Sequence, residues 1–165
     1  MQQYNKKKIY IYKTYQLYRN DGVNTLYEDI TKPRDFLIGF KIVRGAYYNQ
    51  DKKYNILMNT LQETHDNYNN AIRIFIDNFR LGDKLLCATH NNESINNAIQ
   101  YIENNKLHDT IEFAQLMGMS DGQSQKLAKK YTVYKYLPYG NFQDTLPYLI
   151  RRLYENYPMM MNIFK

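Results

Sequence analysis

Short β-branched or aromatic runs alternate along this chain with longer segments of helical periodicity. The strand-like runs occupy residues 9–12, 36–43, 85–89, 110–116 and 133–137. The helical segments occupy residues 21–30, 56–79, 94–104, 123–130 and 142–156. Strands separated by helices predict βαβ units and a parallel sheet. The chain has 165 residues. A complete (β/α)8 barrel usually needs about 250, so we predict a single α/β domain with fewer strands than a barrel.

Composition excludes several classes of protein. The net charge is +6, but the lysines are scattered apart from Lys6-Lys7-Lys8 and Lys129-Lys130. This diffuse pattern disfavours nucleic-acid binding, which stays a third alternative. The single cysteine, Cys87, rules out an internal disulfide and favours a reducing compartment. No apolar run approaches the roughly 20 residues of a membrane span, and the N-terminus has neither a signal-peptide nor a transit-peptide pattern.

Side chains that are mostly polar gather where the strand-like runs end, the functional edge of parallel α/β folds. They are Lys41, Arg44, Tyr47, Thr89, His90, Asn91, Gln115, Leu116 and Tyr136. His90 has no second Cys or His adjoining it, so no metal site is predicted. The chain also lacks the G-x-G-x-x-G, Walker and G-x-S-x-G motifs. A dinucleotide would therefore have to bind at a barrel rim.

Two adjacent arginines, Arg151 and Arg152, lie on the last helical segment. Neighbouring helical side chains point about 100° apart, so both could reach one ligand only if it lay near the helix between them. Each guanidinium can hold a carboxylate or phosphate in a bidentate fork, and Glu155 is within reach of either. Ordinary surface ion pairs, at about 0.3–0.5 kcal/mol each, explain the spacing equally simply.

Six stretches of the sequence, in order, resemble the proline dehydrogenase family, and most closely its monofunctional eukaryotic type. They are Thr14-Tyr15-Gln16, KIVRGAY at 41–47, ATHN at 88–91, QLMGMSD at 115–121, VYKYLPYG at 133–140 and PYLIRRLYEN at 147–156. The resemblance implies a (β/α)8 TIM-type barrel that binds FAD. This chain is similar to its fourth strand through its last helix, which makes residues 1–165 a single proline dehydrogenase-like domain that is truncated at its N-terminus.

The resemblance also implies the reaction and the substrate contacts. L-proline is oxidised to 1-pyrroline-5-carboxylate, with hydride passing to flavin N5 and electrons on to quinone. Arg151 and Arg152 match the pair that clamps the substrate carboxylate. Tyr136 and Leu116 match residues around the proline ring, and Tyr47 lies close to it. With Lys41, which matches a basic residue beside flavin N5, the expected catalytic residues are Lys41, Tyr136, Arg151 and Arg152.

By the same resemblance, a larger set of residues is expected to touch FAD. This set is Gln16, Lys41, Val43, Arg44, Gly45, Thr64, Thr89, His90, Asn91, Gln115 and Glu155.

The partners and the cellular location stay open at this stage. The rest of the barrel could come from a complementing N-terminal half or from a second copy of the chain. Alternatively, the chain is an inactive remnant that serves as a flavin-binding or interaction module. The resemblance implies a mitochondrial location at the inner membrane, whereas the missing import segment leaves the cytoplasm open.

Overall fold

The computed structural model describes residues 1–44 and 51–161, without the side chains of residues 152, 153 and 155–161. The chain divides into two compact units, Met1–Lys135 and Tyr136–Lys165, which we describe separately.

The first unit is built on a five-stranded sheet whose strand order follows the sequence. Its strands are β1 (Tyr12–Gln16), β2 (Gly39–Val43), β3 (Lys84–Ala88), β4 (Ile111–Leu116) and β5 (Val133–Tyr136). The first four pair in parallel, with Tyr12 opposite Gly39 and Gly39 opposite Lys84. Because parallel neighbours need a crossover connection, each strand is followed by helical structure on its way to the next.

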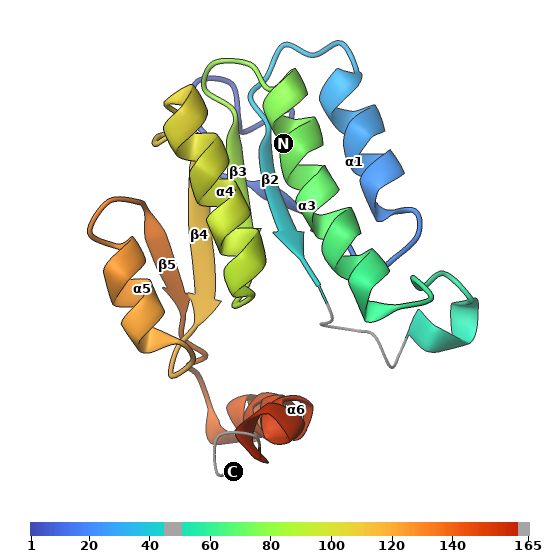
Figure 1. Cartoon of the computed structure of the whole chain (residues 1–165), viewed down its shortest axis with the longest axis vertical. Coiled ribbons are helices and arrows are strands. Elements are labelled where there is room, and N and C mark those ends of the chain that lie inside the picture. The colour runs from blue at the N-terminus through green and yellow to red at the C-terminus, as the bar shows by residue number, and fades with distance from the viewer. Residues whose placement is uncertain (45–50, 162–165) are drawn as a thin grey trace. The chain divides into compact units, whose positions relative to one another are not determined.

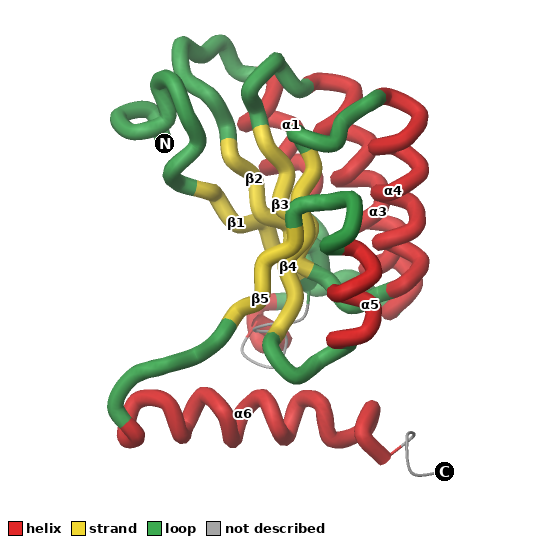
Figure 2. Tube along the Cα trace, turned by 90° about the vertical axis from the view of Figure 1, so that its left-hand side faces the viewer, coloured by secondary structure: helices red, strands yellow, loops and turns green. Residues whose placement is uncertain are grey.

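The helices of the first unit lie on one face of the sheet (Figures 1 and 2). They are α1 (Gly22–Thr31), α3 (Leu61–Asn78), α4 (Asn92–Asn105) and α5 (Asp121–Leu127), and a 3-10 turn, η1, spans Lys52–Tyr54. A doubly wound sheet has helices on both faces, whereas a (β/α) barrel has them only outside. Sequential strand order with one-sided helices is therefore the arrangement of a barrel arc, and the predicted α/β fold with a parallel sheet is confirmed.

The core lies between the sheet and these helices. Phe40 and Ile42 of β2 and Leu85 and Cys87 of β3 alternate with less buried neighbours, so one face of each strand enters the core. The helices contribute Leu26, Ile30, Tyr68, Ala71, Ile72, Phe75, Ile95, Ala98 and Ile102.

The other side of the sheet, which we call the open face, is the side turned away from α1, α3, α4 and α5. Here the Tyr12 hydroxyl of β1 donates to Glu112 Oε2 of β4 at 2.9 Å, and Lys84 of β3 pairs with Glu112 Oε1 at 2.5 Å. In a flat sheet β1 and β4 would lie three strand spacings apart, about 14 Å. A side-chain contact across that span indicates that the sheet curls toward the open face. Gly39 lets the segment before β1 pack closely against β2, because a Cβ there would lie 2.6 Å from Ile9 Cγ2 and 2.9 Å from the Ile11 carbonyl oxygen.

Two predicted strands begin several residues later than the sequence pattern indicated, whereas the strand predicted at 110–116 begins one residue later, at Ile111. The strand predicted at residues 9–12 lies instead at Tyr12–Gln16, because Asn5 Oδ1 accepts the N–H groups of Tyr10 and Ile11 and keeps them out of the sheet. The strand predicted from residue 36 begins at Gly39, because Leu37 N–H donates to the Asn5 carbonyl.

The helix predicted over residues 56–79 begins only at Leu61. Residues 56–58 bond to an earlier loop instead, with Met58 N–H donating to the Tyr18 carbonyl. Thr60 then caps the helix by accepting from Glu63 N–H at 3.0 Å, and Glu63 reaches back to Thr60 N–H. Near the C-terminus, α5 begins and ends earlier than the predicted 123–130. The predicted strand at 133–137 ends at Tyr136, and the last helix runs beyond residue 156.

The second unit contains this last helix, α6 (Phe142–Met161). At its start the ring of Tyr148 lies 5.8 Å from the ring of Tyr136. The guanidinium of Arg151 also lies over Tyr148, 5.8 Å from the ring centroid, within cation–π range. In the part of the chain that the structure describes, no helix is both long enough and apolar enough to cross a membrane.

Candidate active site at the carboxyl ends of the strands

The predicted site residues of the first unit divide between the two faces of the sheet. Lys41 and Val43 of β2 alternate with buried Phe40 and Ile42, so they lie on the open face. By the same alternation Leu116 lies on the open face at the end of β4, next to buried Gln115 on the helix side.

Arg44, the residue after β2, has its guanidinium fixed on the helix side. Its Nη1 donates to His65 Nδ1 of α3 at 2.8 Å. Its Nη2 donates to Thr89 Oγ1 at 3.1 Å and to Ser94 Oγ of α4 at 2.7 Å. The group also stacks on the Tyr68 ring, 3.8 Å from its centroid. Arg44 thus joins the ends of two strands to the first two turns of the helices that follow them.

This cation has neutral partners. Within residues 1–44 and 51–161, no carboxylate forms an ion pair with Arg44, and Glu93 attracts it only at longer range. Burial lowers the pKa of Arg44, yet a guanidinium still stays charged at neutral pH. Its Nε is also buried without a described partner. Because an unpaired buried charge is costly, the site is suited to an anionic group.

His90, just after β3, forms a hydrogen bond with the backbone of Leu116 at the end of β4. Its Nε2 accepts the Leu116 N–H at 3.2 Å, so the neutral ring has its proton on Nδ1. Burial, followed by the positive charge of Lys135, lowers the pKa of His90 and favours this neutral form. Nδ1 of His90 is buried and has no hydrogen-bond partner among the described residues. The same is true of Oε1 of Gln16, at the end of β1.

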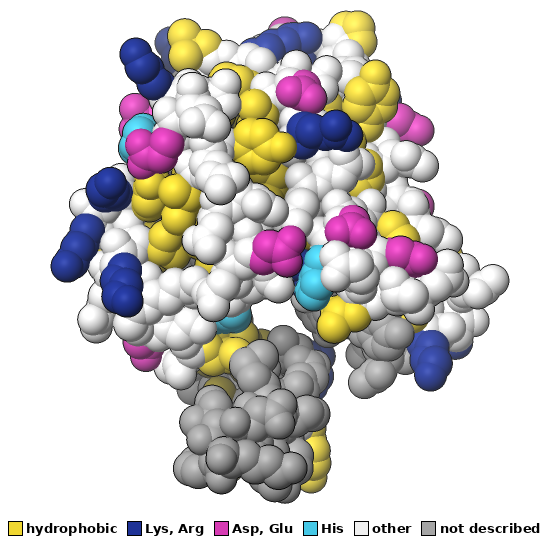
Figure 3. Space-filling model, viewed as in Figure 1, with side chains coloured by type: hydrophobic (Ala, Val, Ile, Leu, Met, Phe, Trp, Pro, Cys, Tyr) yellow, Lys and Arg dark blue, Asp and Glu magenta, His cyan; other side chains and the backbone are white. Residues whose placement is uncertain are grey.

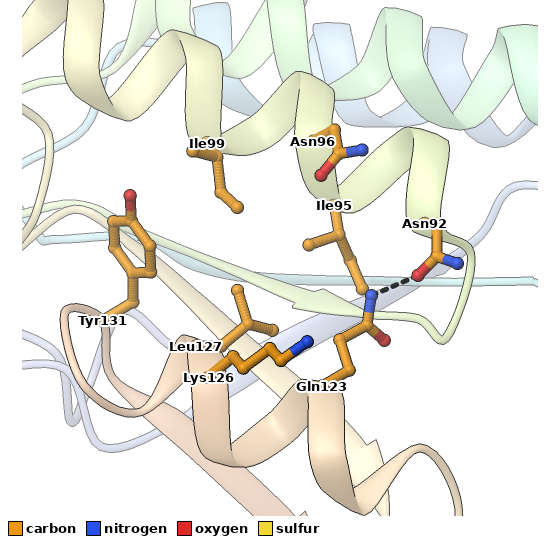
Figure 4. Close-up of a pocket in the computed structure, with 8 residues that line it drawn as sticks. All are labelled: Asn92, Ile95, Asn96, Ile99, Gln123, Lys126, Leu127 and Tyr131. Atoms are coloured by element: carbon orange, nitrogen blue, oxygen red, sulfur yellow. Dashed lines mark hydrogen bonds between the residues drawn. The ribbon is translucent and has the colours of Figure 1, made fainter.

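Gln115 is occupied by protein contacts on the helix side. Its Nε2 donates to the Thr89 carbonyl at 3.3 Å and to Gln123 Oε1 at 3.2 Å, and its Oε1 accepts from the Ser124 hydroxyl. Both N–H groups are therefore used, and only one lone pair of Oε1 is left for a ligand. Gln123 extends this chain of hydrogen bonds to Asn92 (Figure 4).

Other predicted contacts have local roles. Asn91 caps α4, because its Oδ1 accepts from Ser94 N–H at 2.9 Å. Thr64 is buried in α3 and donates to the Thr60 carbonyl at 3.3 Å. Lys41 is half-buried on the open face and makes no ion pair with a described carboxylate.

The remaining predicted residues fall outside the described side chains of the first unit. Gly45 and Tyr47 lie outside the described residues, as do the side chains of Arg152 and Glu155. Arg151 and Tyr136 belong to the second unit, where both are exposed. The structure therefore brings together Gln16, Arg44, Thr89, His90, Gln115 and Leu116.

The proline dehydrogenase family model matches residues 1–162. The chain belongs to the proline dehydrogenase family. Proline dehydrogenase 1, mitochondrial, from Dictyostelium discoideum is 36% identical over 171 residues, which cover 93% of this chain and 30% of that protein. Hydroxyproline dehydrogenase from Xenopus laevis is 32% identical over 181 residues, which cover 100% of this chain and 39% of that protein.

Among solved structures, proline utilization A from Bdellovibrio bacteriovorus matches with a TM-score of 0.81 and 23% identity. The match covers 93% of this chain and 17% of that one, and it supports the fold. The chain spans about a third of the length of the curated proline dehydrogenases that it matches.

The strand ends fit the FAD that the proline dehydrogenase family implies. Three consecutive strand ends each present a buried polar atom without a described partner: an acceptor on Gln16, a donor on Arg44 and a donor on His90. Buried polar atoms are ordinarily hydrogen-bonded, so these atoms match a polar ligand at the rim. In the described part of the chain, no group of three His, Cys, Asp or Glu side chains could hold a metal ion.

Sequence reasoning missed the residues that hold the proline dehydrogenase motif residues in place. His65 and Ser94 fix Arg44, and Ser124 and Gln123 fix Gln115. All four lie in the first two turns of the helix that follows a strand. Since those turns begin at the rim, polar residues there are the signal that could have found them.

A pocket of about 410 Å³ lies between α4 and α5, outside the rim (Figure 4). Apolar Ile95, Ile99 and Leu127 line it together with Asn96 and Lys126.

On the face in Figure 3, Lys and Arg side chains are spread over several elements with acidic side chains between them.

Proposed function

We propose that this chain provides the FAD- and substrate-binding rim of a proline dehydrogenase. The reaction would oxidise L-proline to 1-pyrroline-5-carboxylate, and the electrons would pass on to a quinone. The observation that supports this most directly is the row of unpartnered polar atoms on Gln16, Arg44 and His90, at the ends of three neighbouring strands. FAD, when bound, supplies the hydride acceptor at its flavin N5.

The two faces of the rim suggest two kinds of role. On the open face Lys41 and Val43 would line the flavin, and the Lys41 charge would favour an electron-rich reduced ring. Leu116 would pack against the proline ring. On the helix side Arg44, Thr89 and Gln115 would hold the strand ends in position. Arg44, with no carboxylate partner among the described residues, would also attract an anionic part of FAD.

Arg151 and Arg152 would hold the substrate carboxylate. A bidentate guanidinium fixes both the distance and the angle of a carboxylate, so the pair would orient the reacting C–H bond. Tyr148 supports Arg151 through its ring face, and Tyr136 packs against the same ring. Tyr136, Tyr47, Gly45 and Glu155 keep the substrate and cofactor roles that the family resemblance implies, as do Thr64 and Asn91.

The partners belong to the same proposal. Five strands form an arc, so the working barrel would be closed by a complementing N-terminal portion or by a second copy. Several curated relatives are named mitochondrial, and we propose that location for the working protein.

The test measures flavin uptake and turnover by the purified chain. After incubation with FAD and removal of free cofactor, we expect a flavin absorption spectrum that L-proline bleaches in the absence of oxygen. Hydroxyproline is the matched comparison substrate, given the hydroxyproline dehydrogenase relative. A chain that takes up no FAD, alone or with its complementing portion, would contradict the proposal and favour an interaction module.

The clamp is tested by Arg151→Ala and Arg152→Ala. Losing a charged contact to the substrate carboxylate should raise KM for L-proline by about 10-fold or more, because such hydrogen bonds contribute about 1.5–3 kcal/mol. Arg73→Ala removes an exposed arginine of α3 and is the matched control. Unchanged kinetics in both clamp variants would refute the assignment.

A further inference from the structure

The β4–α5 loop, residues 117–120, connects Leu116 to α5 through an unusual backbone. Met119 N–H donates to the Leu116 carbonyl at 3.2 Å, which closes a tight turn. Gly118, at the third position, has φ 79°, the value that a type II turn requires and that glycine adopts freely. Ser120 is also left-handed, at φ 52°. A non-glycine residue keeps such a conformation only where its surroundings enforce it.

Lys135 of β5 holds the residues on either side of Ser120. Its Nζ donates to the Leu116 carbonyl at 3.1 Å and to the Met119 carbonyl at 2.8 Å, and it pairs with Asp121 Oδ1 at 2.6 Å. An ammonium has three N–H groups, so every donor of Lys135 is used on the two ends of this loop. Its side chain is only 19% exposed.

The same leucine is held from the opposite side by His90. His90 Nε2 accepts the Leu116 N–H, whereas Lys135 Nζ donates to the Leu116 carbonyl. Both backbone polar groups of Leu116 are therefore fixed by side chains from the neighbouring strands on either side. The Leu116 side chain lies on the open face, so its position there depends on these two anchors.

We propose that Lys135 is a positioning residue of the substrate site, which fixes Leu116 and thereby sets the space available to the ring of the bound imino acid. This inference rests on the proposed function, because it takes Leu116 as a contact of the substrate ring. Lys135 itself lies on the helix side of β5, with Val133, and it acts on the substrate only through Leu116.

A purely structural role would have a different signature. Val133 already packs against the core, and Asp121 is 53% exposed, so losing the Lys135 contacts removes little of what holds the sheet together. The β4–α5 loop that Lys135 holds is itself exposed, since Met117 is 49% exposed. Removing Lys135 should therefore loosen the loop while the rest of the first unit keeps its fold.

The first arm of the test is amide hydrogen exchange on the full chain and needs no catalysis. In Lys135→Met we expect the amides of Leu116 and Met119 to exchange at least 10-fold faster, while those of Leu85 and Cys87 in β3 are unchanged. Lys129→Met removes the same charge from an exposed lysine and should change neither set. Unchanged exchange at Leu116 and Met119 overturns the proposal.

The second arm is kinetic and uses the FAD-loaded protein. Lys135→Met should raise KM for L-proline about 10-fold with kcat within about threefold. It should also reduce the ratio of kcat/KM for L-proline to kcat/KM for its six-membered-ring analogue. The reason is that a less firmly held Leu116 can move aside for the larger ring. Lys135→Arg should restore most of both properties. A fall in kcat with unchanged KM and unchanged ring preference would overturn the proposal.

The two arms separate this inference from the proposed function. If the wild-type chain binds FAD but oxidises no imino acid, the proposed function fails, and hydrogen exchange still decides whether Lys135 anchors Leu116. If the wild type is active and Lys135→Met behaves as Lys129→Met does in both arms, only the positioning role fails.

Discussion

Two arginines, one at each end of the sheet, are held in opposite ways. Arg34 precedes β2 and forms a bidentate ion pair with Asp83, in which the side chains are 2% and 0% exposed. Asp83 also accepts the N–H groups of Ile38 and Arg80. Arg44 follows β2 and stacks on Tyr68 among neutral hydrogen-bond partners.

The contrast lies in the balance of charge, because both arginines have a buried Nε without a described partner. At the amino ends of the strands, the charge of Arg34 is balanced within the protein. At the carboxyl ends, the charge of Arg44 has no carboxylate partner in the described residues, and unpartnered atoms of Gln16 and His90 lie on the neighbouring strand ends. Barrel enzymes place binding groups at the carboxyl ends, which agrees with this division.

The largest effect is expected at the amino end. Asp83→Asn removes the counter-charge of a buried arginine, and breaking such a pair costs about 3–5 kcal/mol. We therefore expect the free energy of unfolding, measured with urea, to fall by about 3 kcal/mol or more, with little change in FAD affinity for the fraction that stays folded. Asp35→Asn is the control, because its ion pair with Lys6 is exposed and its loss should not be measurable. A stability loss as small as that of the control would remove the amino-end half of the comparison.

An intermediate effect is expected at the carboxyl end, on binding rather than on folding. Arg44→Met keeps the length of the side chain but removes a cation that has no carboxylate partner. We expect FAD affinity, measured by fluorescence titration, to fall about 10-fold, equivalent to about 1.4 kcal/mol. The loss of unfolding free energy should be less than half that of Asp83→Asn. If Arg44→Met unfolds the protein as strongly as Asp83→Asn while Arg73→Met does not, Arg44 is a structural residue and the comparison fails.

The smallest effect concerns Cys87, which lies beneath Tyr68 and Arg44. Burial raises the pKa of Cys87 to about 12, whereas an unfolded thiol ionises near pH 8.5. Below that pH the thiol is protonated in both states, so its ionisation does not make the free energy of unfolding depend on pH. As the pH rises further, the unfolded state loses its proton first, so the free energy of unfolding falls, by at most about 1.4 kcal/mol per pH unit.

The measurement is urea unfolding at several pH values between about 7.5 and 9, where unfolded tyrosines, which ionise near pH 10, are still mostly protonated. In Cys87→Ala the part of the slope that comes from the thiol should vanish. An unaltered slope would show that Cys87 is ionised as easily in the folded protein as in the unfolded one.

The sequence predicted the parts of this fold that depend on local pattern. Alternation of strands and helices predicts the parallel sheet, and the order of short motifs places Lys41, His90 and Leu116 at the carboxyl ends. The start of β1 could not be predicted in this way, because Ile9 to Tyr12 is a favourable strand sequence. A side chain several residues earlier, Asn5, binds that backbone instead.

The contacts that hold the site residues in place could not be predicted from the sequence for a similar reason. Arg44 meets His65 and Ser94, which are 21 and 50 residues further along the chain. Lys135 meets Leu116 across 19 residues. Such pairs are made by the topology, and no local periodicity indicates them.

The alternation of side chains at the strand ends makes this rim sensitive to insertions. A single extra residue just before Lys41 would exchange the roles of the last residues of β2, turning the Arg44 position toward the open face and the Lys41 position toward the core. The chain could still form a sheet, but the charge of Lys41 would face the core and the apolar side chain of Ile42 would lie on the open face. The spacing of residues within each strand is thus as much a part of the proposed binding rim as the residues themselves.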